Sequence, residues 1–151
     1  MTNWEEQQKE FKIQKGIRDA EDDLVIAIEE RLNNQKSYGK LEDSQYRNLM
    51  HVADTTGSIA VIKNFLRYQL GRDKKWGEGK ESLAEKIIDD IDDKLKQKAL
   101  EIIEKSGCNE TEKIEKIKPV WLELTRRYLS YGSRHLKYLN PSKSTSPSKT
   151  N

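Results

Sequence analysis

The feature that most constrains the fold is a helical repeat of apolar residues that recurs through most of the chain. In its clearest stretch, over residues 114–138, large apolar and aromatic side chains alternate at steps of three and four. They are Ile114, Ile117, Trp121, Leu124, Tyr128, Tyr131, His135 and Tyr138. Such a seam is typical of a helix that packs lengthwise on other helices. Pro119 lies inside it, so we expect a kink or a new helix start there.

Four earlier segments have the same period, and strand-like alternation does not appear. They cover residues 19–33, 43–54, 59–70 and 82–105. Side chains that cap helix N-termini precede three of them: Asp43 or Ser44, Thr56 or Ser58, and Ser82. The expected inward faces are Leu24, Val25, Ile28 and Leu32; Tyr46, Leu49, Met50 and Ala53; Ile59, Ile62, Leu66 and Leu70; and Leu83, Ile87, Ile91, Leu95 and Ile102. The pattern predicts an all-α, single-domain bundle of about five helices.

The two ends of the chain lack a sustained repeat. Near the start, Gly16 interrupts a polar segment with few apolar residues, so we expect a mobile or partner-dependent arm. The last twelve residues, NPSKSTSPSKTN, offer no apolar side chain to bury, which is typical of disorder. The predicted organisation is a polar N-terminal arm over residues 1–18, a helical bundle domain over 19–139 and a disordered tail over 140–151. Gly71 is expected to end the 59–70 helix in a left-handed conformation.

Composition indicates a soluble protein of the cell interior. Of the 151 residues, 36% are charged and 34% hydrophobic, enough for one domain with a small core. The single cysteine, Cys108, cannot form an internal disulfide, and the N-terminus has no basic lead before an apolar run. No apolar run approaches the roughly 20 residues of a membrane-spanning helix. We therefore expect a cytoplasmic protein without membrane contact.

Residues that could support catalysis do not form a constellation. His51 and Asp54 are three residues apart on one helix, but a metal site needs three or four ligands. Cys108 has no activating neighbour. The acids within residues 89–93 fan around their helix and cannot converge on one cation, so we expect a solvated acidic face. The sequence predicts no enzyme activity, no metal and no cofactor.

Basic residues are concentrated in two stretches, although the formal net charge is only +2. The first contains Arg47, Lys63, Arg67, Arg72, Lys74 and Lys75, and the second contains Arg126, Arg127, Arg134 and Lys137. Lysine and arginine neutralise phosphates without reading bases, so a nucleic-acid backbone is the candidate ligand. The alternative is that these cations solvate helix faces, with Arg67 and Arg72 paired to the acids of residues 89–93.

Two further functions remain open on the residues alone. The segments 44–54 and 59–70, joined by a short turn, also suit a helix-turn-helix regulator that reads DNA. Lys63 would occupy a position that this motif buries, which weakens that interpretation. A helical adaptor that binds only proteins is the other alternative.

The segments LEDSQYRNLMHVA (41–53) and IKNFLRYQLGRD (62–73) resemble the small subunit of type III CRISPR-Cas effector complexes. In that family, a Ser-Gln-x-Arg-Asn helix start precedes a helix that ends in an aromatic residue followed by Gly-Arg. The matching residues are Ser44, Gln45, Arg47, Asn48, Tyr68, Gly71 and Arg72. The 82–105 helix and the N-terminal arm have no counterpart that we can assign.

The resemblance implies a non-catalytic, all-α protein that stacks in several copies and contacts guide RNA, target RNA and other effector subunits. The RNA-binding candidates are then Arg47, Lys63, Arg67, Arg72, Lys74, Lys75, Arg126 and Arg127. Ser44 is interpreted as a helix cap that orients Arg47. Tyr68 is interpreted as a core residue, with a platform at the RNA as the alternative.

Overall fold

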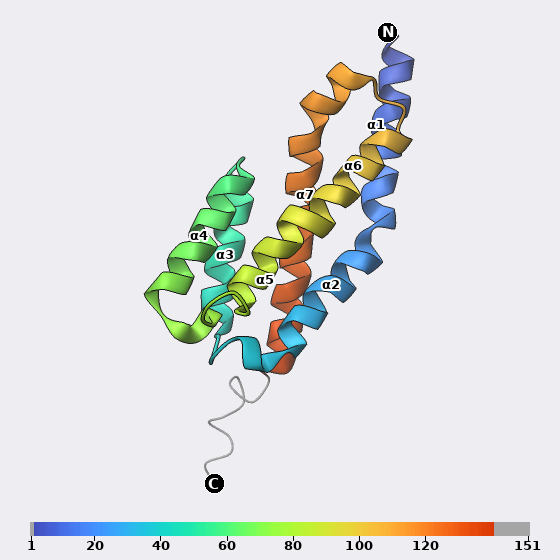
Figure 1. The fold of residues 1–151 in the computed structure, drawn as a ribbon. Helices are drawn as coiled ribbons and strands as arrows, with labels where there is room; N and C mark the ends of the chain where they lie inside the picture. The colour runs from blue at the N-terminus through green and yellow to red at the C-terminus, as the bar shows by residue number, and fades with distance from the viewer. Residues whose placement is uncertain (1, 141–151) are drawn as a thin grey trace.

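The computed structural model describes residues 2–140, and within that range every regular element is helical (Figure 1). The α-helices are α1 (Asn3–Asp19), α2 (Glu21–Asn33), α3 (Asp43–Thr55), α4 (Ile59–Arg72), α5 (Leu83–Asp90), α6 (Lys96–Lys105) and α7 (Glu110–Leu139). Two short 3₁₀ helices, η1 (Gln35–Ser37) and η2 (Lys74–Trp76), lie in loops, and the π-helical segment η3 (Ile91–Leu95) joins α5 to α6.

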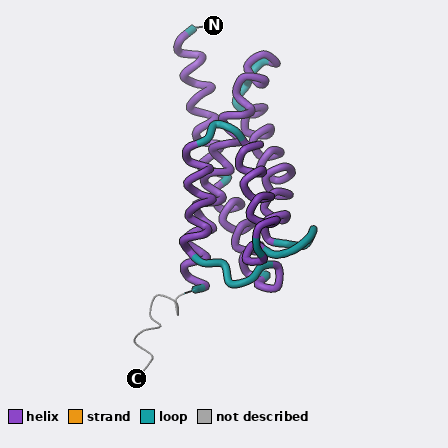
Figure 2. Tube along the Cα trace, turned by 90° about the vertical axis from the view of Figure 1, so that its left-hand side faces the viewer, coloured by secondary structure: helices purple, strands orange, loops and turns teal. Residues whose placement is uncertain are grey.

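These elements form five rods, so the predicted all-α bundle of about five helices is confirmed. Only Ala20 separates α1 from α2, and α5, η3 and α6 run without a break from residue 83 to residue 105. The helices α3, α4 and α7 are the other rods. Figure 2 shows them running along roughly one common direction, and the turn between α3 and α4 lies part-way along the bundle because this hairpin is shorter than the other rods.

The long helix α7 is the centre of the bundle, and it packs against α2, α3 and α6. Its residues Leu124, Tyr128 and Leu129 are fully buried. The hydroxyl of Tyr46, on α3, donates to the carbonyl of Leu129 at 2.9 Å, and Gly132 leaves the room that the Tyr46 ring needs. The predicted seam is therefore correct in its middle, where it is buried, and its two ends are exposed at Ile114 and Tyr138.

Most of the predicted caps are confirmed. The Ser58 hydroxyl accepts from the Val61 amide and the Ser82 hydroxyl accepts from the Glu85 amide, each at 3.2 Å. The cap of α3 differs from the prediction, because Glu42 rather than Asp43 or Ser44 forms a capping box. Ser44 is an exposed residue inside the helix, so it does not orient Arg47 as a cap.

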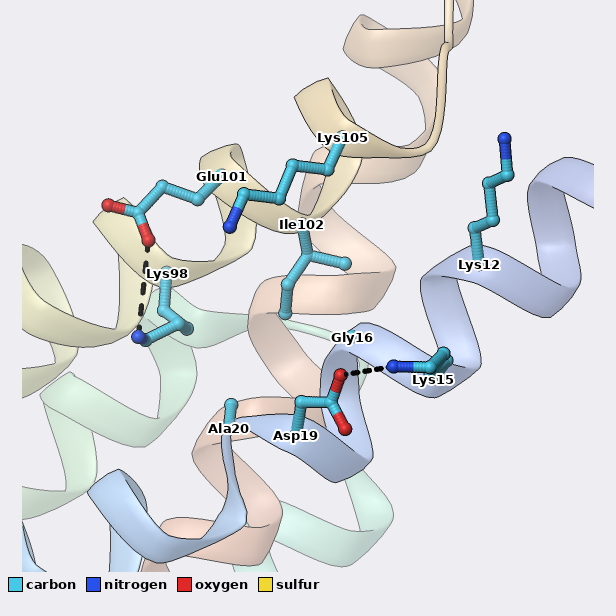
Figure 3. A pocket seen from close by; sticks show the side chains of 9 residues that line it. All are labelled: Lys12, Lys15, Gly16, Asp19, Ala20, Lys98, Glu101, Ile102 and Lys105. Carbon is cyan, nitrogen blue, oxygen red and sulfur yellow. Dashed lines mark hydrogen bonds and ion pairs between the residues drawn. The ribbon is translucent and has the colours of Figure 1, made fainter.

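The N-terminal segment differs from the predicted mobile arm. Residues 3–19 form the continuous helix α1, which packs on α6 and α7 and buries Ile13 and Ile17. Gly16 does not interrupt the helix. A Cβ atom at Gly16 would lie 2.9 Å from the Ile102 side chain, so the glycine permits close approach of α1 to α6 (Figure 3).

Three other expectations are revised or fall outside the described residues. The helix α7 continues through Pro119, so no new helix starts there. The helix α4 runs through Gly71, whose φ is not positive, and ends at Arg72. The predicted disordered tail lies outside the described residues except for Asn140. Among the described helices, none is both long and apolar enough to cross a membrane.

Asp90 on α5 forms an ionic centre inside the bundle. Its carboxylate is almost fully buried and accepts hydrogen bonds from the guanidinium of Arg31 on α2 and the hydroxyl of Tyr128 on α7. The acidic face predicted for residues 89–93 is therefore only partly solvated, because one of its members is a core residue that joins three helices.

The π-helical segment η3 leaves a backbone carbonyl available to a side chain. The carbonyl of Ile91 accepts a hydrogen bond from the indole Nε1 of Trp121 at 2.7 Å. Lys96 lies over the same indole, with its Nζ 5.2 Å from the ring centroid. Because α7 supplies this donor, the wide turn of η3 is held at a fixed position along the bundle.

Candidate nucleic-acid interface

The helices α3 and α4 form an antiparallel hairpin that brings two predicted arginines to the same level. Arg47 and Arg67 each stand ten residues from Gly57 in the connecting turn. At about 1.5 Å per helical residue, both side chains start roughly 15 Å from that turn. The start of α3 and the end of α4 therefore share one end of the bundle (Figure 1). Arg47, Arg67 and Arg72 are all exposed there.

Two loops enlarge this basic region. The amide of Gly39, in the loop after η1, donates to the carbonyl of Lys75 in η2 at 3.0 Å. This contact brings Lys36 and Lys40, both exposed, to the end of the hairpin where Arg72 lies. We define the basic end as Lys36, Lys40, Arg47, Arg67, Arg72 and Lys75. Sequence reasoning missed Lys36 and Lys40, because nothing in a loop sequence indicates which distant loop it will contact.

The loop that carries Lys75 is anchored rather than a mobile flap. Trp76 is 1% exposed and stacks on Tyr46, with ring centroids 5.9 Å apart. Gly77 follows with a φ of 98°, and a Cβ atom there would collide with the Ser37 backbone. Only glycine fits this position, and the tight approach fixes η2 against the loop of η1.

The six cations of the basic end have no ion pair with any residue in the range 2–140. Nearby acids are used elsewhere. Asp43 pairs with Lys137 at 3.4 Å, Glu78 pairs with Lys74 at 3.3 Å, and Asp73 caps η2 through the Lys75 amide. The basic end therefore has positive charge that the described part of the molecule leaves uncompensated.

Tyr68 is not the core residue that we expected. Its side chain is 59% exposed, and the guanidinium of Arg72 lies over its ring at 6.0 Å from the centroid. It stands one turn from Arg72 on the outer face of α4, which has nothing packed against it in the described structure. An exposed aromatic ring beside a cation suits stacking against a base or sugar.

Two of the predicted cations are paired within the chain. Lys63 on α4 contacts Asp92 at 2.8 Å and is only 21% exposed, so it joins α4 to the η3 segment. Lys74 contacts Glu78 at 3.3 Å, but both side chains are exposed, and such a pair is weak. We therefore remove Lys63 from the candidate site and retain Lys74 only at its margin.

The predicted second basic group is structural at its first two positions. Arg126 donates from Nε to the carbonyl of Ala53 at 2.8 Å and from Nη2 to the carbonyl of Thr56 at 2.9 Å, which caps the end of α3. Arg127 pairs with Glu123 and with Glu21 on α2. The Glu123 hydrogen bond is the main cause that raises the pKa of Arg127. Neither guanidinium points to a free surface, so both leave the candidate site.

The alternative pairing for Arg67 and Arg72 is also settled by these contacts. Two of the four acids within residues 89–93 have other partners, since Arg31 pairs with Asp90 and Lys63 pairs with Asp92. No contact joins Arg67 or Arg72 to that helix within the described residues. The expected pairing of Arg67 and Arg72 with these acids is therefore not present in the described residues.

The two segments that carry the family resemblance lie at the same end of the α3 and α4 hairpin. Its first half lies at the start of α3, where Arg47 and Asn48 are exposed and Gln45 completes the capping box with the Glu42 amide at 2.9 Å. Its second half lies at the end of α4, where Tyr68 and Arg72 are exposed. The hairpin thus joins two motif halves about twenty residues apart into one surface patch.

Two residues with reactive side chains lie elsewhere in the described part of the chain. His51 is exposed, and Cys108 is buried with its Sγ 3.1 Å from the Ser106 hydroxyl. Among the described residues, no group of three His, Cys, Asp or Glu side chains could hold a metal ion. The groove between α1 and α6 is floored by Gly16 and Ile102, and its lysines at positions 15 and 98 pair with acids (Figure 3).

No protein-family model, curated protein or solved structure matches the chain.

Proposed function

We propose that this chain is a non-catalytic small subunit of a type III CRISPR-Cas ribonucleoprotein, which binds the backbone of a guide RNA and target RNA duplex through its basic end. The observation that supports it best is the meeting of the two motif halves. Arg47 and Arg72 come from different helices, yet both are exposed at one end of the hairpin, with Tyr68 beside them.

Recognition in this proposal is electrostatic and independent of sequence. The guanidinium groups of Arg47, Arg67 and Arg72 face phosphates, and Lys36, Lys40 and Lys75 extend the same surface along the backbone. Tyr68 offers a flat ring to a ribose or an exposed base. None of these residues reads a base edge in a duplex, which suits a subunit that accepts any guide sequence.

The opposite end of the molecule suits contacts with protein neighbours. Trp4 and Phe11 lie seven residues apart on one face of α1 and are 66% and 59% exposed, and Ile114 at the start of α7 is 76% exposed. The starts of α1 and α7 lie at the end of the bundle away from the basic end (Figure 1). An apolar end of this kind supports contact with other effector subunits or with a further copy of the chain.

The same apolar end is the observation that favours the protein-binding adaptor as a second candidate. The helix-turn-helix regulator has less support. In that motif the first residues of the second helix read base edges. Here the exposed residues at the start of α4 are Ala60, Val61 and Asn64, which include no cation. Lys63, which would have to be buried in the motif, is instead held by Asp92.

The proposal is tested by binding of the purified chain to a labelled RNA duplex, measured by fluorescence anisotropy over a salt series. The Arg67→Glu plus Arg72→Glu variant should bind more weakly than wild type. Its slope of log K against log salt should fall by about 0.9 for each phosphate that the variant no longer neutralises. The matched control is Lys12→Glu plus Arg18→Glu, which makes the same change of charge at exposed positions on α1.

The control variant should keep the wild-type slope, which separates a local contact from a general effect of net charge. Circular dichroism of both variants should match wild type, because all four substituted side chains are exposed. If the Arg67 and Arg72 variant binds duplex as tightly as wild type, the basic end is not an RNA surface. A preference for one DNA site of about 10³-fold over random duplex would support the regulator instead.

A further inference from the structure

A groove between α2 and α7 brings aromatic and charged side chains together outside the basic end. Its lining residues are Val25, Glu29, Tyr131, Arg134, His135 and Tyr138. The groove lies near the end of α7, and Lys137, next to Tyr138, contacts Asp43 at the start of α3. It therefore adjoins the end of the hairpin that carries Arg47.

Tyr138 is a largely exposed ring that stacks on a neighbouring side chain of α7. It stacks on His135, with centroids 5.8 Å apart and an interplanar angle of 30°, and its side chain is 73% exposed. Both nitrogens of His135 face partners on α2: Nε2 lies 2.7 Å from Asn33 Oδ1 and Nδ1 lies 3.7 Å from Glu29. The imidazole is thus fixed, and the Tyr138 ring rests on it as a stacking platform.

Arg134 supplies a cation at the same groove. Its guanidinium lies over the ring of Tyr131 at 5.9 Å from the centroid, and that ring is held by a hydrogen bond from its hydroxyl to Glu21. Arg134 is exposed and makes no ion pair within the described residues, so its donors can reach a phosphate. Glu29 is the one acid in the lining, and it is directed to His135.

We propose that this groove is a second RNA site, in which an unpaired nucleotide stacks on Tyr138 while Arg134 contacts its phosphate. The inference rests on the proposed function, since it takes the nucleotide to belong to RNA held at the basic end. The formal charges of Arg134 and Glu29 cancel, so stacking rather than charge supplies most of the affinity. Binding at the groove should therefore depend on salt much less than binding at the basic end.

The test compares two labelled probes with the full chain: single-stranded oligouridylate and a blunt RNA duplex, each at low and at high salt. Tyr138→Ala should weaken oligouridylate binding at least about fivefold at both salt concentrations. It should leave duplex binding unchanged. Tyr138→Phe keeps the ring and loses only the hydroxyl, so it should bind like wild type. Arg134→Gln should weaken oligouridylate binding at low salt more than at high salt.

The two proposals fail in different ways. If Tyr138→Ala binds oligouridylate like wild type, or if the wild-type chain does not bind it, the groove is not a nucleotide site. Failure of the wild-type chain to bind oligouridylate is also expected if the groove receives a protein segment. If wild type binds oligouridylate through Tyr138 but ignores the duplex, the groove stands and the proposed function of the basic end fails. Because Tyr138 is exposed, loss of folding does not complicate the comparison.

Discussion

The guanidinium of Arg31 donates two hydrogen bonds to the carboxylate of Asp90, at 2.8 Å and 3.0 Å, across the interface of α2 and α5. Asp90 is 1% exposed, so the removal of Arg31 leaves a buried carboxylate with only the Tyr128 hydroxyl and the more distant Lys94 ammonium, at 3.9 Å, to stabilise its charge. We predict that Arg31→Ala lowers the free energy of unfolding by about 3–5 kcal/mol. Urea denaturation followed by circular dichroism measures the change.

A surface pair provides the control for that prediction. Lys15 and Asp19 contact each other at 2.8 Å on α1, with both side chains about 60% exposed. Lys15→Ala should leave the urea midpoint where it is in wild type, because solvent screens such pairs. An Arg31→Ala midpoint equal to that of Lys15→Ala would show that the Asp90 centre contributes nothing to stability.

Two glycines within helices should respond in opposite directions to alanine. A Cβ atom at Gly132 would lie 2.7 Å from Ile28 Cγ1 and would also collide with the Tyr46 hydroxyl, so Gly132→Ala should destabilise the protein by about 1–3 kcal/mol or more. A Cβ atom at Gly71 would meet no atom within 4 Å, and Gly71→Ala should stabilise by about 0.5–1 kcal/mol. Thermal unfolding compares the two, and a Gly132→Ala variant as stable as wild type would contradict the packing described for α7.

Stability should fall in alkaline solution because of two buried tyrosines. Burial raises the pKa of Tyr46, and burial together with the charge of Asp90 raises the pKa of Tyr128. Above pH 10 the unfolded chain releases these protons while the folded chain keeps them. The free energy of unfolding should therefore decrease by about 1.4 kcal/mol per pH unit for each tyrosine, and the full contribution is present below pH 10.

Urea titrations between pH 9 and pH 11 measure that slope. Tyr46→Phe removes one titrating group. Above pH 10, its free energy of unfolding should therefore fall less steeply than that of wild type, by about 1.4 kcal/mol per pH unit. The variant also loses the hydrogen bond to Leu129, which lowers stability at all pH values by roughly 1 kcal/mol and does not change the slope. An unchanged slope would mean that Tyr46 does not keep its proton in the folded state.

Arg126 and Arg47 should separate stability from RNA binding. The Arg126 guanidinium caps the carbonyls of Ala53 and Thr56, so Arg126→Ala should lower the free energy of unfolding by about 1–3 kcal/mol. The folded variant should bind duplex RNA like wild type. Arg47→Ala should weaken duplex binding and leave the free energy of unfolding unchanged, because its side chain is exposed and has no partner in the described chain. Urea unfolding measures the stability of both variants, and fluorescence anisotropy measures their binding to duplex RNA.

The bundle could be predicted because its signals are local. Residues such as Leu49 and Ile62 recur at helical spacing, and Ser82 stands where a cap is needed, so a single stretch of sequence contains the information. The effect of Gly16 on helix α1 could not be predicted in this way. Whether it breaks α1 depends on Ile102, which approaches it from a helix more than eighty residues away.

The same limit explains the errors at the candidate site. Arg126 and Arg47 look alike in the sequence, yet one caps a distant helix end and the other has no partner in the described chain. The expectation for Tyr68 fails for another reason, because Tyr68 lies two residues from Leu66 and two from Leu70, and helical spacing therefore places it off the buried row of α4. Whether an exposed cation gains a partner is decided by which elements pack together, and helical periodicity does not contain that information.

The π-helical segment η3 also affects how chains like this one should be aligned. A π turn holds one more residue than an α turn, so η3 turns α6 about its axis by about 100° relative to a regular helix. A relative that lacks both the extra residue and the π turn would keep the same face of α6 toward α1 and α7, with each position after the turn numbered one lower than Ile102 and Ile103 are here. An alignment of such relatives should therefore place its single-residue gap within residues 91–95, and one that omits the gap would pair core positions with surface positions throughout α6.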